Sequence, residues 1–297
     1  MKQGFVKVAS ATPRIRVADP VYNAQVICEQ AKEAAEHGAK IVVFPELCIT
    51  GYTCNDLFLQ ELLLEKAKEA LLTIAEETGQ LETLFLVGLP VDKDGRLYNV
   101  AAVLYRGRIL GMIPKKNIPM YAEFYEGRHF TPGEETVTEY RLGKQVIPFG
   151  SNLLFRCEEL PELILGCELC EDLWVAEPPS TSHALMGATV IANLSASNET
   201  VSKDDYRTLL IKASSARLLC GYIYTSAGEG ESTQDLVFGG HDLIAENGTL
   251  LVQSARFTTG ILYTDLDVLK ISSERRRMGT FGTMPSTGVP VRKCGSF

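Results

Sequence analysis

Short apolar stretches alternate along the chain with segments whose apolar positions recur at helical spacing. The runs Phe5 to Ala9 and Ala39 to Phe44 are typical of strands buried on both faces. Between them, a predicted helix begins at Asp19-Pro20, where aspartate is a favoured N-cap and proline a favoured first residue, and it ends near Gly38. A strand, a helix and a second strand in this order predict an α/β fold.

Two turn sequences predict antiparallel hairpins. Arg106-Gly107-Arg108 separates the predicted strands Tyr98 to Tyr105 and Ile109 to Ile113, and its glycine can adopt a positive φ. Glu246-Asn247-Gly248 joins two further predicted strands later in the chain. The sheet structure is therefore expected to contain both parallel and antiparallel pairs.

The remaining pattern predicts further helices and strands, and two irregular segments. The other predicted helices are Leu57 to Glu77, Ser182 to Gly187, and a helix from Asp204 or Asp205 to Cys220; the other predicted strands are Leu84 to Leu89, Leu163 to Gly166, Thr189 to Asn193, Tyr222 to Thr225 and Ile261 to Asp267. The segment from Asn117 to about Ser151 is rich in aromatic and charged residues and is predicted to be a long functional loop. The tail from Met278, which contains several glycines and prolines, resembles a linker.

Composition narrows the class of protein. The 297 residues are 45% hydrophobic and 22% charged, as expected for one large globular domain. The net charge of −8 disfavours a nucleic-acid surface, and the short basic cluster Arg275 to Arg277 is expected on a solvated face. No apolar run approaches the length of a membrane span, and eight cysteines at irregular spacing favour reduced thiols in the cytoplasm.

Cys170 is the first candidate for chemistry, because it follows a predicted strand at the edge where open α/β sheets bind ligands. Free cysteines are often small buried hydrophobes, so position alone does not make it a nucleophile. Its neighbours Glu168, Glu171 and Asp172 are acidic and would keep the proton on the thiol. An activating group must therefore come from elsewhere in the chain.

Other cysteine chemistry is disfavoured by what surrounds Cys170. It forms a CxxC pair with Cys167, but a structural zinc site needs a second ligand pair, and the chain has no other CxxC or HxxxH, so no metal is predicted. A Cys–His protease is disfavoured because none of the four histidines lies in a matching motif. Two other reactive side chains, Glu46 and Lys115, also follow predicted strands.

Four motifs occur in the order of the nitrilase (carbon–nitrogen hydrolase) superfamily, which the chain resembles over nearly its whole length. They are FPEL at Phe44 to Leu47 with Gly51-Tyr52, PKKNIP at Pro114 to Pro119, EGRHFTPG at Glu126 to Gly133, and CELCEDLW at Cys167 to Trp174. The segments IPMYAEFYEGRHFTPG, CEDLWVAEPPS, NLSASNET and SERRRMGTFGT are similar to the glutaminase domain of glutamine-dependent NAD+ synthetases. This resemblance implies a four-layer αββα sandwich.

The resemblance also implies an activity and a domain organisation. The domain would hydrolyse the side-chain amide of glutamine, and the ammonia would pass to a C-terminal synthetase domain that amidates nicotinic acid adenine dinucleotide. Residues 1–275 would form the glutamine amidohydrolase domain, and 276–297 a linker toward a synthetase domain that this chain lacks. No cofactor is expected here, since ATP and Mg²⁺ would serve the synthetase domain. Members of the superfamily commonly form homo-oligomers.

By motif position, the resemblance assigns four catalytic residues. Cys170 would be the nucleophile, Glu46 the general base, Lys115 the cation that stabilises the oxyanion, and Glu126 the residue that orients Lys115. An ammonium beside the thiol would favour both the thiolate and the oxyanion. The choice of Lys115 over Lys116 depends on the alignment of PK-x-x-I-P, in which a slip of one residue is conceivable.

Three further residues fall where the resemblance implies contacts to glutamine: Tyr121, Ser197 and Lys203. A basic residue suits an α-carboxylate, and hydroxyl or carbonyl groups suit an α-ammonium. The family more often has arginine at the position of Lys203, and lysine loses the bidentate geometry that arginine offers.

Two alternatives to a glutaminase stay open. A free-standing nitrilase-type amidase acting on another small amide or carbamoyl compound would share Glu46, Lys115 and Cys170, so only the substrate pocket separates the two. A catalytically silent binding or assembly module would require that one of these three residues be missing, and all are present.

Overall fold

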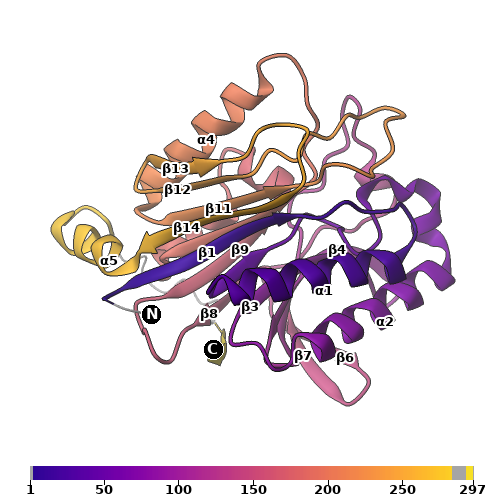
Figure 1. Ribbon diagram of the computed structural model, residues 1–297, viewed down its shortest axis with the longest axis horizontal. Coiled ribbons are helices and arrows are strands. Elements are labelled where there is room, and N and C mark those ends of the chain that lie inside the picture. Colours follow the sequence, from indigo (N-terminus) through magenta and orange to yellow (C-terminus); the bar gives the residue numbers. More distant parts are fainter. Residues whose placement is uncertain (1–2, 283–291, 297) are drawn as a thin grey trace.

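The computed structural model describes residues 3–282 and 292–296, which form two sheets packed face to face between helices (Figure 1). The first sheet has the order β14-β1-β2-β3-β4-β5-β7-β6, and the second has the order β13-β12-β11-β10-β9-β8-β15. The strands of the first sheet are β1 (Phe5–Thr12), β2 (Ile41–Val43), β3 (Leu84–Lys93), β4 (Arg96–Tyr105), β5 (Arg108–Pro114), β6 (Thr138–Leu142), β7 (Gln145–Phe149) and β14 (Gly260–Asp267). Those of the second are β8 (Leu153–Arg156), β9 (Ile164–Leu169), β10 (Val190–Ser195), β11 (Gly221–Ser226), β12 (Leu243–Glu246), β13 (Thr249–Gln253) and β15 (Arg292–Ser296).

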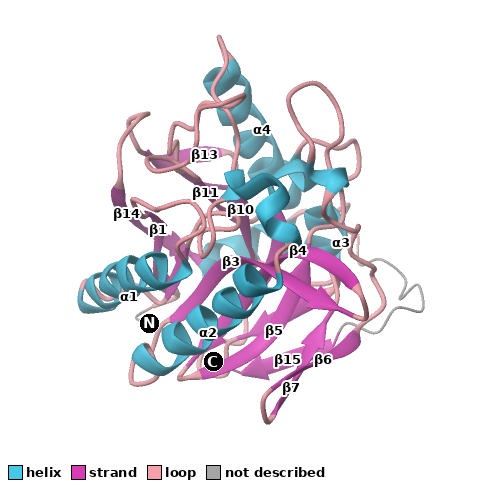
Figure 2. Cartoon of the chain, turned by 90° about the vertical axis from the view of Figure 1, so that its right-hand side faces the viewer, coloured by secondary structure: helices cyan, strands magenta, loops and turns pink. Residues whose placement is uncertain are grey.

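Helices form the two outer layers. On the first sheet lie α1 (Pro20–Glu36) and α2 (Glu61–Glu77), which run side by side in Figure 2; on the second lie α3 (Pro179–Leu185) and α4 (Lys203–Leu218), and α5 (Val268–Arg277) follows β14. Buried apolar side chains form one cluster between the sheets and one beneath each helical layer. The predicted four-layer αββα sandwich with a mixed sheet structure is confirmed.

Strand β9 shows how the sheets place functional residues. Its side chains alternate between the two faces of the sheet, so that Leu165, Cys167 and Leu169 pack between the sheets while Glu168 points toward α3. Strands β9, β10 and β11 are parallel, and their carboxyl ends meet at one edge. Cys170 directly follows β9, as the sequence predicted.

Two elements differ from the predicted ones. The helix predicted from Leu57 begins at Glu61, because Tyr52–Leu59 is a 3-10 segment in which Asn55 takes a non-helical conformation of φ 48° and ψ −133°. The long loop predicted from Asn117 contains the hairpin β6–β7, whose second strand pairs with β5 through Met112 and Phe149.

The C-terminal region also differs from expectation. The predicted boundary after residue 275 falls inside α5, and β15 pairs with β8 in the tail for which the sequence predicted a linker. Arg275 does not lie on a solvated face: it donates hydrogen bonds to the carbonyl oxygens of Ala188, Leu218 and Leu219. Residues 283–291 and 297 of the predicted linker lie outside the described residues. Within the described ranges, no helix is both long and apolar enough to cross a membrane.

Candidate active site

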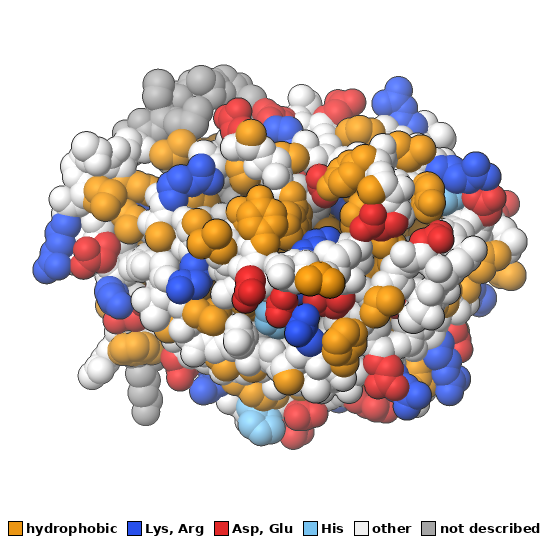
Figure 3. All heavy atoms as spheres, turned by 90° about the horizontal axis from the view of Figure 1, so that it is seen from above, with side chains coloured by type: hydrophobic (Ala, Val, Ile, Leu, Met, Phe, Trp, Pro, Cys, Tyr) orange, Lys and Arg blue, Asp and Glu red, His pale blue; other side chains and the backbone are white. Residues whose placement is uncertain are grey.

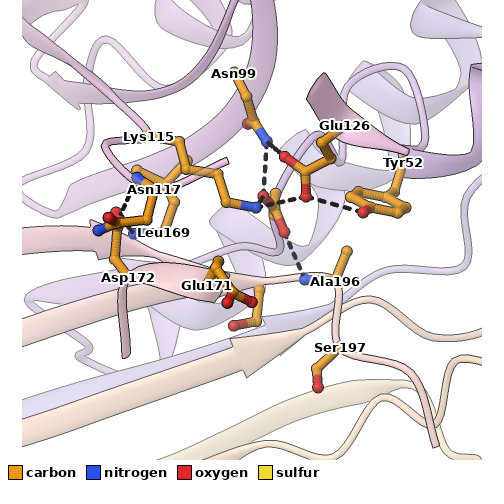
Figure 4. A network of polar contacts seen from close by, with 12 residues as sticks. Tyr52, Asn99, Lys115, Asn117, Glu126, Leu169, Glu171, Asp172, Ala196 and Ser197 are labelled. Atoms are coloured by element: carbon orange, nitrogen blue, oxygen red, sulfur yellow. Dashed lines mark hydrogen bonds and ion pairs between the residues drawn. The ribbon is translucent and has the colours of Figure 1, made fainter. Parts of the chain in front are cut away.

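Two carboxylates and one ammonium meet in the interior, beyond the ends of β2 and β5 (Figure 4). Lys115, the residue after β5, places its Nζ 2.7 Å from Oε1 of Glu46 and 2.6 Å from Oε1 of Glu126. The side chains of Lys115 and Glu46 are fully buried, and that of Glu126 is 4% exposed. The structure therefore brings together three of the predicted catalytic residues. When all three side chains are ionised, this buried group has a net charge of −1.

Three hydrogen-bond donors hold the carboxylate of Glu46. Its Oε1 accepts hydrogen bonds from Lys115 and from Nδ2 of Asn99 at 2.7 Å, and its Oε2 accepts one from the backbone N–H of Ala196 at 2.9 Å. Gly88 on β3 permits this approach, since a Cβ atom there would lie 2.8 Å from the carbonyl carbon of Glu46. Burial, outweighing the stabilising charge of Lys115, raises the pKa of Glu46 to about 7.

Glu126 orients the lysine and is itself oriented by two neighbours. Its Oε1 accepts a hydrogen bond from the hydroxyl of Tyr52 at 2.9 Å, and its Oε2 accepts one from Asn99 at 3.3 Å. Sequence reasoning did not assign a role to Tyr52 or Asn99. The one signal for Asn99 was a lone amide inside the apolar strand β4, where a buried polar group needs partners.

Cys170 is a buried neutral thiol beside this group. Burial, followed by the charge of Glu46, raises its pKa to about 12, although Lys115 acts in the opposite direction. The charge of Lys115 favours the thiolate, as expected, but burial and the charges of Glu46 and Glu126 outweigh it. Cys170 also has φ of 40°, a strained value for a residue other than glycine, at the turn between β9 and the following 3-10 segment.

The acids expected to keep the proton on Cys170 have other partners. Glu168 accepts hydrogen bonds from the N–H of Ser180 and from the hydroxyl of Tyr222. Asp172 accepts hydrogen bonds from the N–H groups of Leu169 and Asn117, at 3.0 and 2.8 Å. Both carboxylates thus stabilise the turn that carries Cys170, and the acid that acts most strongly on the thiol is Glu46.

A cavity of about 370 Å³ leads to Cys170, and the three residues predicted to contact substrate all line it. Tyr121 is 55% exposed and Ser197 is buried. Nζ of Lys203 lies 5.5 Å from the ring centroid of Phe124 and 5.2 Å from that of Trp174. No carboxylate among the described residues forms an ion pair with Lys203, and it is the one Lys or Arg among the residues that line the cavity. Figure 3 shows the face of the molecule that lies at the top of Figure 1, where hydrophobic side chains lie among Lys, Arg, Asp and Glu side chains.

Glu171 is a cavity residue that sequence reasoning treated only as a neighbour of the thiol. Both of its carboxylate oxygens lie 3.0 Å from the hydroxyl of Tyr121, and its side chain lines the same cavity. The cavity is thus lined by the carboxylates of Glu171 and Glu123 and by the ammonium of Lys203, which suits a zwitterion. No group of three or more histidine, cysteine, aspartate or glutamate side chains in the described part of the chain is arranged to hold a metal ion.

Comparison with known proteins shows the family to which the chain belongs. The family described as "Carbon-nitrogen hydrolase" matches residues 7–276. A glutamine-dependent NAD(+) synthetase from Mycobacterium tuberculosis is 43% identical over 282 residues, which are 94% of this chain and 42% of that protein. The chain thus spans less than half the length of this relative.

Two solved structures share the fold. The crystal structure of a glutamine-dependent NAD(+) synthetase from Cytophaga hutchinsonii aligns with a TM-score of 0.80 at 28% identity, covering 88% of this chain and 43% of that one. An amidase from Nesterenkonia sp. aligns with a TM-score of 0.70 at 21% identity, covering 93% and 97% of the two chains. At that identity the amidase shows a common fold alone.

Proposed function

This chain belongs to the carbon–nitrogen hydrolase family, and we propose that it hydrolyses the side-chain amide of glutamine as the glutaminase part of a glutamine-dependent NAD+ synthetase. The observation that carries this proposal is the position of Cys170, which lies beside the buried Glu46, Lys115 and Glu126 and also lines a cavity suited to a zwitterion. The likeness to the synthetases supports glutamine as the zwitterion.

The proposed acylation begins with a neutral thiol. Glu46 takes the proton from Cys170 as Sγ bonds to the amide carbon, and Lys115 stabilises the oxyanion that forms. The C–N bond then breaks, Glu46 returns the proton to the leaving nitrogen, and ammonia departs from a thioester. General base help of this kind contributes about 10²–10⁴ in rate, and an oxyanion donor about 10²–10³.

Deacylation uses the same residues. A water molecule gives a proton to Glu46 and attacks the thioester carbon, and Lys115 again stabilises the oxyanion. The C–S bond breaks, glutamate is released, and Cys170 recovers its proton from Glu46. A carboxyl group whose pKa is about 7 can both accept and return a proton near neutral pH, which supports this double role.

We assign the amino-acid head of glutamine to the cavity wall. The ammonium of Lys203 and the hydroxyl of Ser197 would bind the α-carboxylate. The carboxylate of Glu171, held by Tyr121, would bind the α-ammonium in place of the hydroxyl or carbonyl group that the sequence suggested. Lysine offers a point charge where arginine would offer a planar fork. The rings of Phe124 and Trp174 on either side of Lys203 limit its freedom and compensate in part.

The ammonia would be used by a synthetase domain outside this chain, where ATP and Mg²⁺ would drive the amidation of nicotinic acid adenine dinucleotide. The greater length of the relatives supports such a partner. We also propose a homo-oligomer in the cytoplasm, a location that suits the seven free, buried cysteines of the described residues.

The proposal predicts a covalent adduct with 6-diazo-5-oxo-L-norleucine, a glutamine analogue that alkylates glutaminase nucleophiles. Intact mass spectrometry should show one adduct, peptide mapping should place it on Cys170, and excess glutamine should block it. A Cys170→Ala variant should form none, whereas Cys167→Ala, which removes another buried thiol on the preceding strand β9, should still react. If folded protein reacts with iodoacetamide at Cys170 but not with the analogue, glutamine is not the substrate and a screen of other amides and carbamoyl compounds follows.

A further inference from the structure

Arg207 is a fully buried guanidinium on α4, one helical turn after Lys203, and it does not line the cavity. Removing such a charge from water costs several kcal/mol unless hydrogen bonds and an opposite charge compensate. The contacts of Arg207 therefore indicate its role. They connect it to Ser197 directly and to Lys203 through Asn198, two residues that we assign to substrate binding.

The first contacts hold the segment that follows β10. Nη2 of Arg207 donates to Oγ of Ser197 at 3.3 Å and to the carbonyl oxygen of Asn198 at 3.1 Å. A guanidinium can only donate, so the Ser197 oxygen accepts here. The hydroxyl hydrogen of Ser197 is not used in this contact and can be donated to Tyr224 or to an acceptor in the cavity, and the adjacent positive charge makes that hydroxyl a stronger donor.

Asn198 in turn contacts two other residues that line the cavity. Its Oδ1 accepts a hydrogen bond from Nζ of Lys203, and its Nδ2 donates to Oε1 of Glu123. Lys203 and Glu123 both line the cavity together with Ser197. By fixing Ser197 and the backbone of Asn198, Arg207 sets the position of three side chains that face the substrate.

Nη1 of Arg207 has two partners, a carboxylate that compensates its charge and a neutral histidine that accepts a hydrogen bond. Its Nη1 lies 2.7 Å from Oε1 of Glu199, whose side chain is 7% exposed, and 3.0 Å from Nδ1 of His241. Because arginine donates, Nδ1 of His241 must accept, which leaves this histidine neutral. Gly239 makes room for Glu199, since a Cβ atom there would lie 2.7 Å from its Cγ atom.

We propose that Arg207 is a positioning residue that builds the subsite for the amino-acid head of the substrate by holding Ser197 and Asn198. The inference rests on the proposed function, because it takes the cavity to bind an amino acid. It predicts that loss of Arg207 weakens recognition of the α-carboxylate and leaves the reactivity of Cys170 unchanged.

The test compares two reagents for the same thiol in the intact chain. 6-Diazo-5-oxo-L-norleucine carries the amino-acid head, and iodoacetamide does not. In the double variant Arg207→Met with Glu199→Gln, which leaves no buried unpaired charge, the second-order rate constant for the first reagent should fall by about 10-fold to 100-fold, the value of a charged hydrogen bond. The rate constant for iodoacetamide should change less than about two-fold on the same argument.

Arg217→Met is the matched control, because Arg217 is an exposed arginine on the same helix, and it should change neither rate constant. If the double variant does not fold by circular dichroism, Arg207→Lys decides: one ammonium cannot replace all the contacts, so the ratio of the two rate constants should still fall. An unchanged ratio, or an equal fall with both reagents, would overturn the inference. Failure of both reagents to label Cys170 in the unaltered chain would instead contradict the proposed function.

Discussion

Replacing Lys115 by methionine should lower the free energy of unfolding by about 3–5 kcal/mol and reduce glutamine hydrolysis by at least about 10²–10³. The ammonium lies within 2.7 Å of two buried carboxylates, and no other cation contacts them among the described residues. Without it, Glu46 and Glu126 must share a buried site as like charges or take up protons. Urea unfolding at pH 7 and ammonia release from glutamine measure the two effects.

Lys116→Met is the matched control, since the change is the same and the site is one residue away. Lys116 forms an ion pair with Glu135, and the two side chains are 37% and 48% exposed. Such surface pairs contribute less than about 1 kcal/mol. The experiment also decides the register of the PK-x-x-I-P motif: a mild effect at Lys115 with a severe one at Lys116 would show that the catalytic lysine was assigned one residue too early.

Locally determined elements were predictable from the sequence. Asp19 was predicted to cap α1, and its carboxylate accepts a hydrogen bond from the N–H of Tyr22 at 3.1 Å. The turn at Arg106-Gly107-Arg108 joins β4 and β5 as predicted. A cap or a tight turn depends on a few adjacent residues, so its signal is complete within a short window.

The missed hairpin β6–β7 depends on distant residues instead. Its strands have only five residues each; β6 carries Glu139 and Arg141 on either side of Tyr140, and β7 contains Pro148, so neither segment gives a strong strand signal. Tyr140, Ile147 and Phe149 are buried because the outer core of the first sheet covers them. The sequence window contains no sign of that core, which is why residues 117–151 were assigned to a loop.

In the candidate site, too, residues within local motifs were predictable and those defined by tertiary contacts were not. Glu46, Lys115 and Cys170 were predicted because each follows a strand within a motif, and the structure brings them to one edge. The role of Asn99 depends on Glu46, which lies far from it in the sequence, and the role of Arg207 depends on which nearby side chains it turns toward in the interior; no motif records either contact. The high pKa of Cys170 could not be predicted either, because burial and the charges of Glu46 and Glu126 raise it while Lys115 and a backbone hydrogen bond lower it.

Glu46→Gln should slow alkylation of Cys170 by iodoacetamide by about 10²–10⁴ and change its dependence on pH. In the unaltered chain, Glu46 accepts the thiol proton only when ionised, so the rate should rise as pH increases and level off above its pKa of about 7. The thiol pKa of about 12 keeps spontaneous thiolate scarce over this range. Glutamine cannot accept the proton, so the residual rate should show no inflection near pH 7. Intact mass spectrometry between pH 5 and pH 9 measures both.

Glu126→Gln is the matched control, because it removes the other carboxylate that holds Lys115 and leaves the base in place. The charge of Glu126 raises the pKa of Glu46, so neutralising it should move the inflection to lower pH while the inflection itself persists. A persistent inflection near pH 7 in Glu46→Gln, together with its loss in Glu126→Gln, would exchange the roles of the two glutamates. We expect instead that Glu46 is the proton acceptor. The backbone N–H of Ala196 binds Oε2 of Glu46 and also interacts with the thiol of Cys170, so this carboxylate lies beside the thiol.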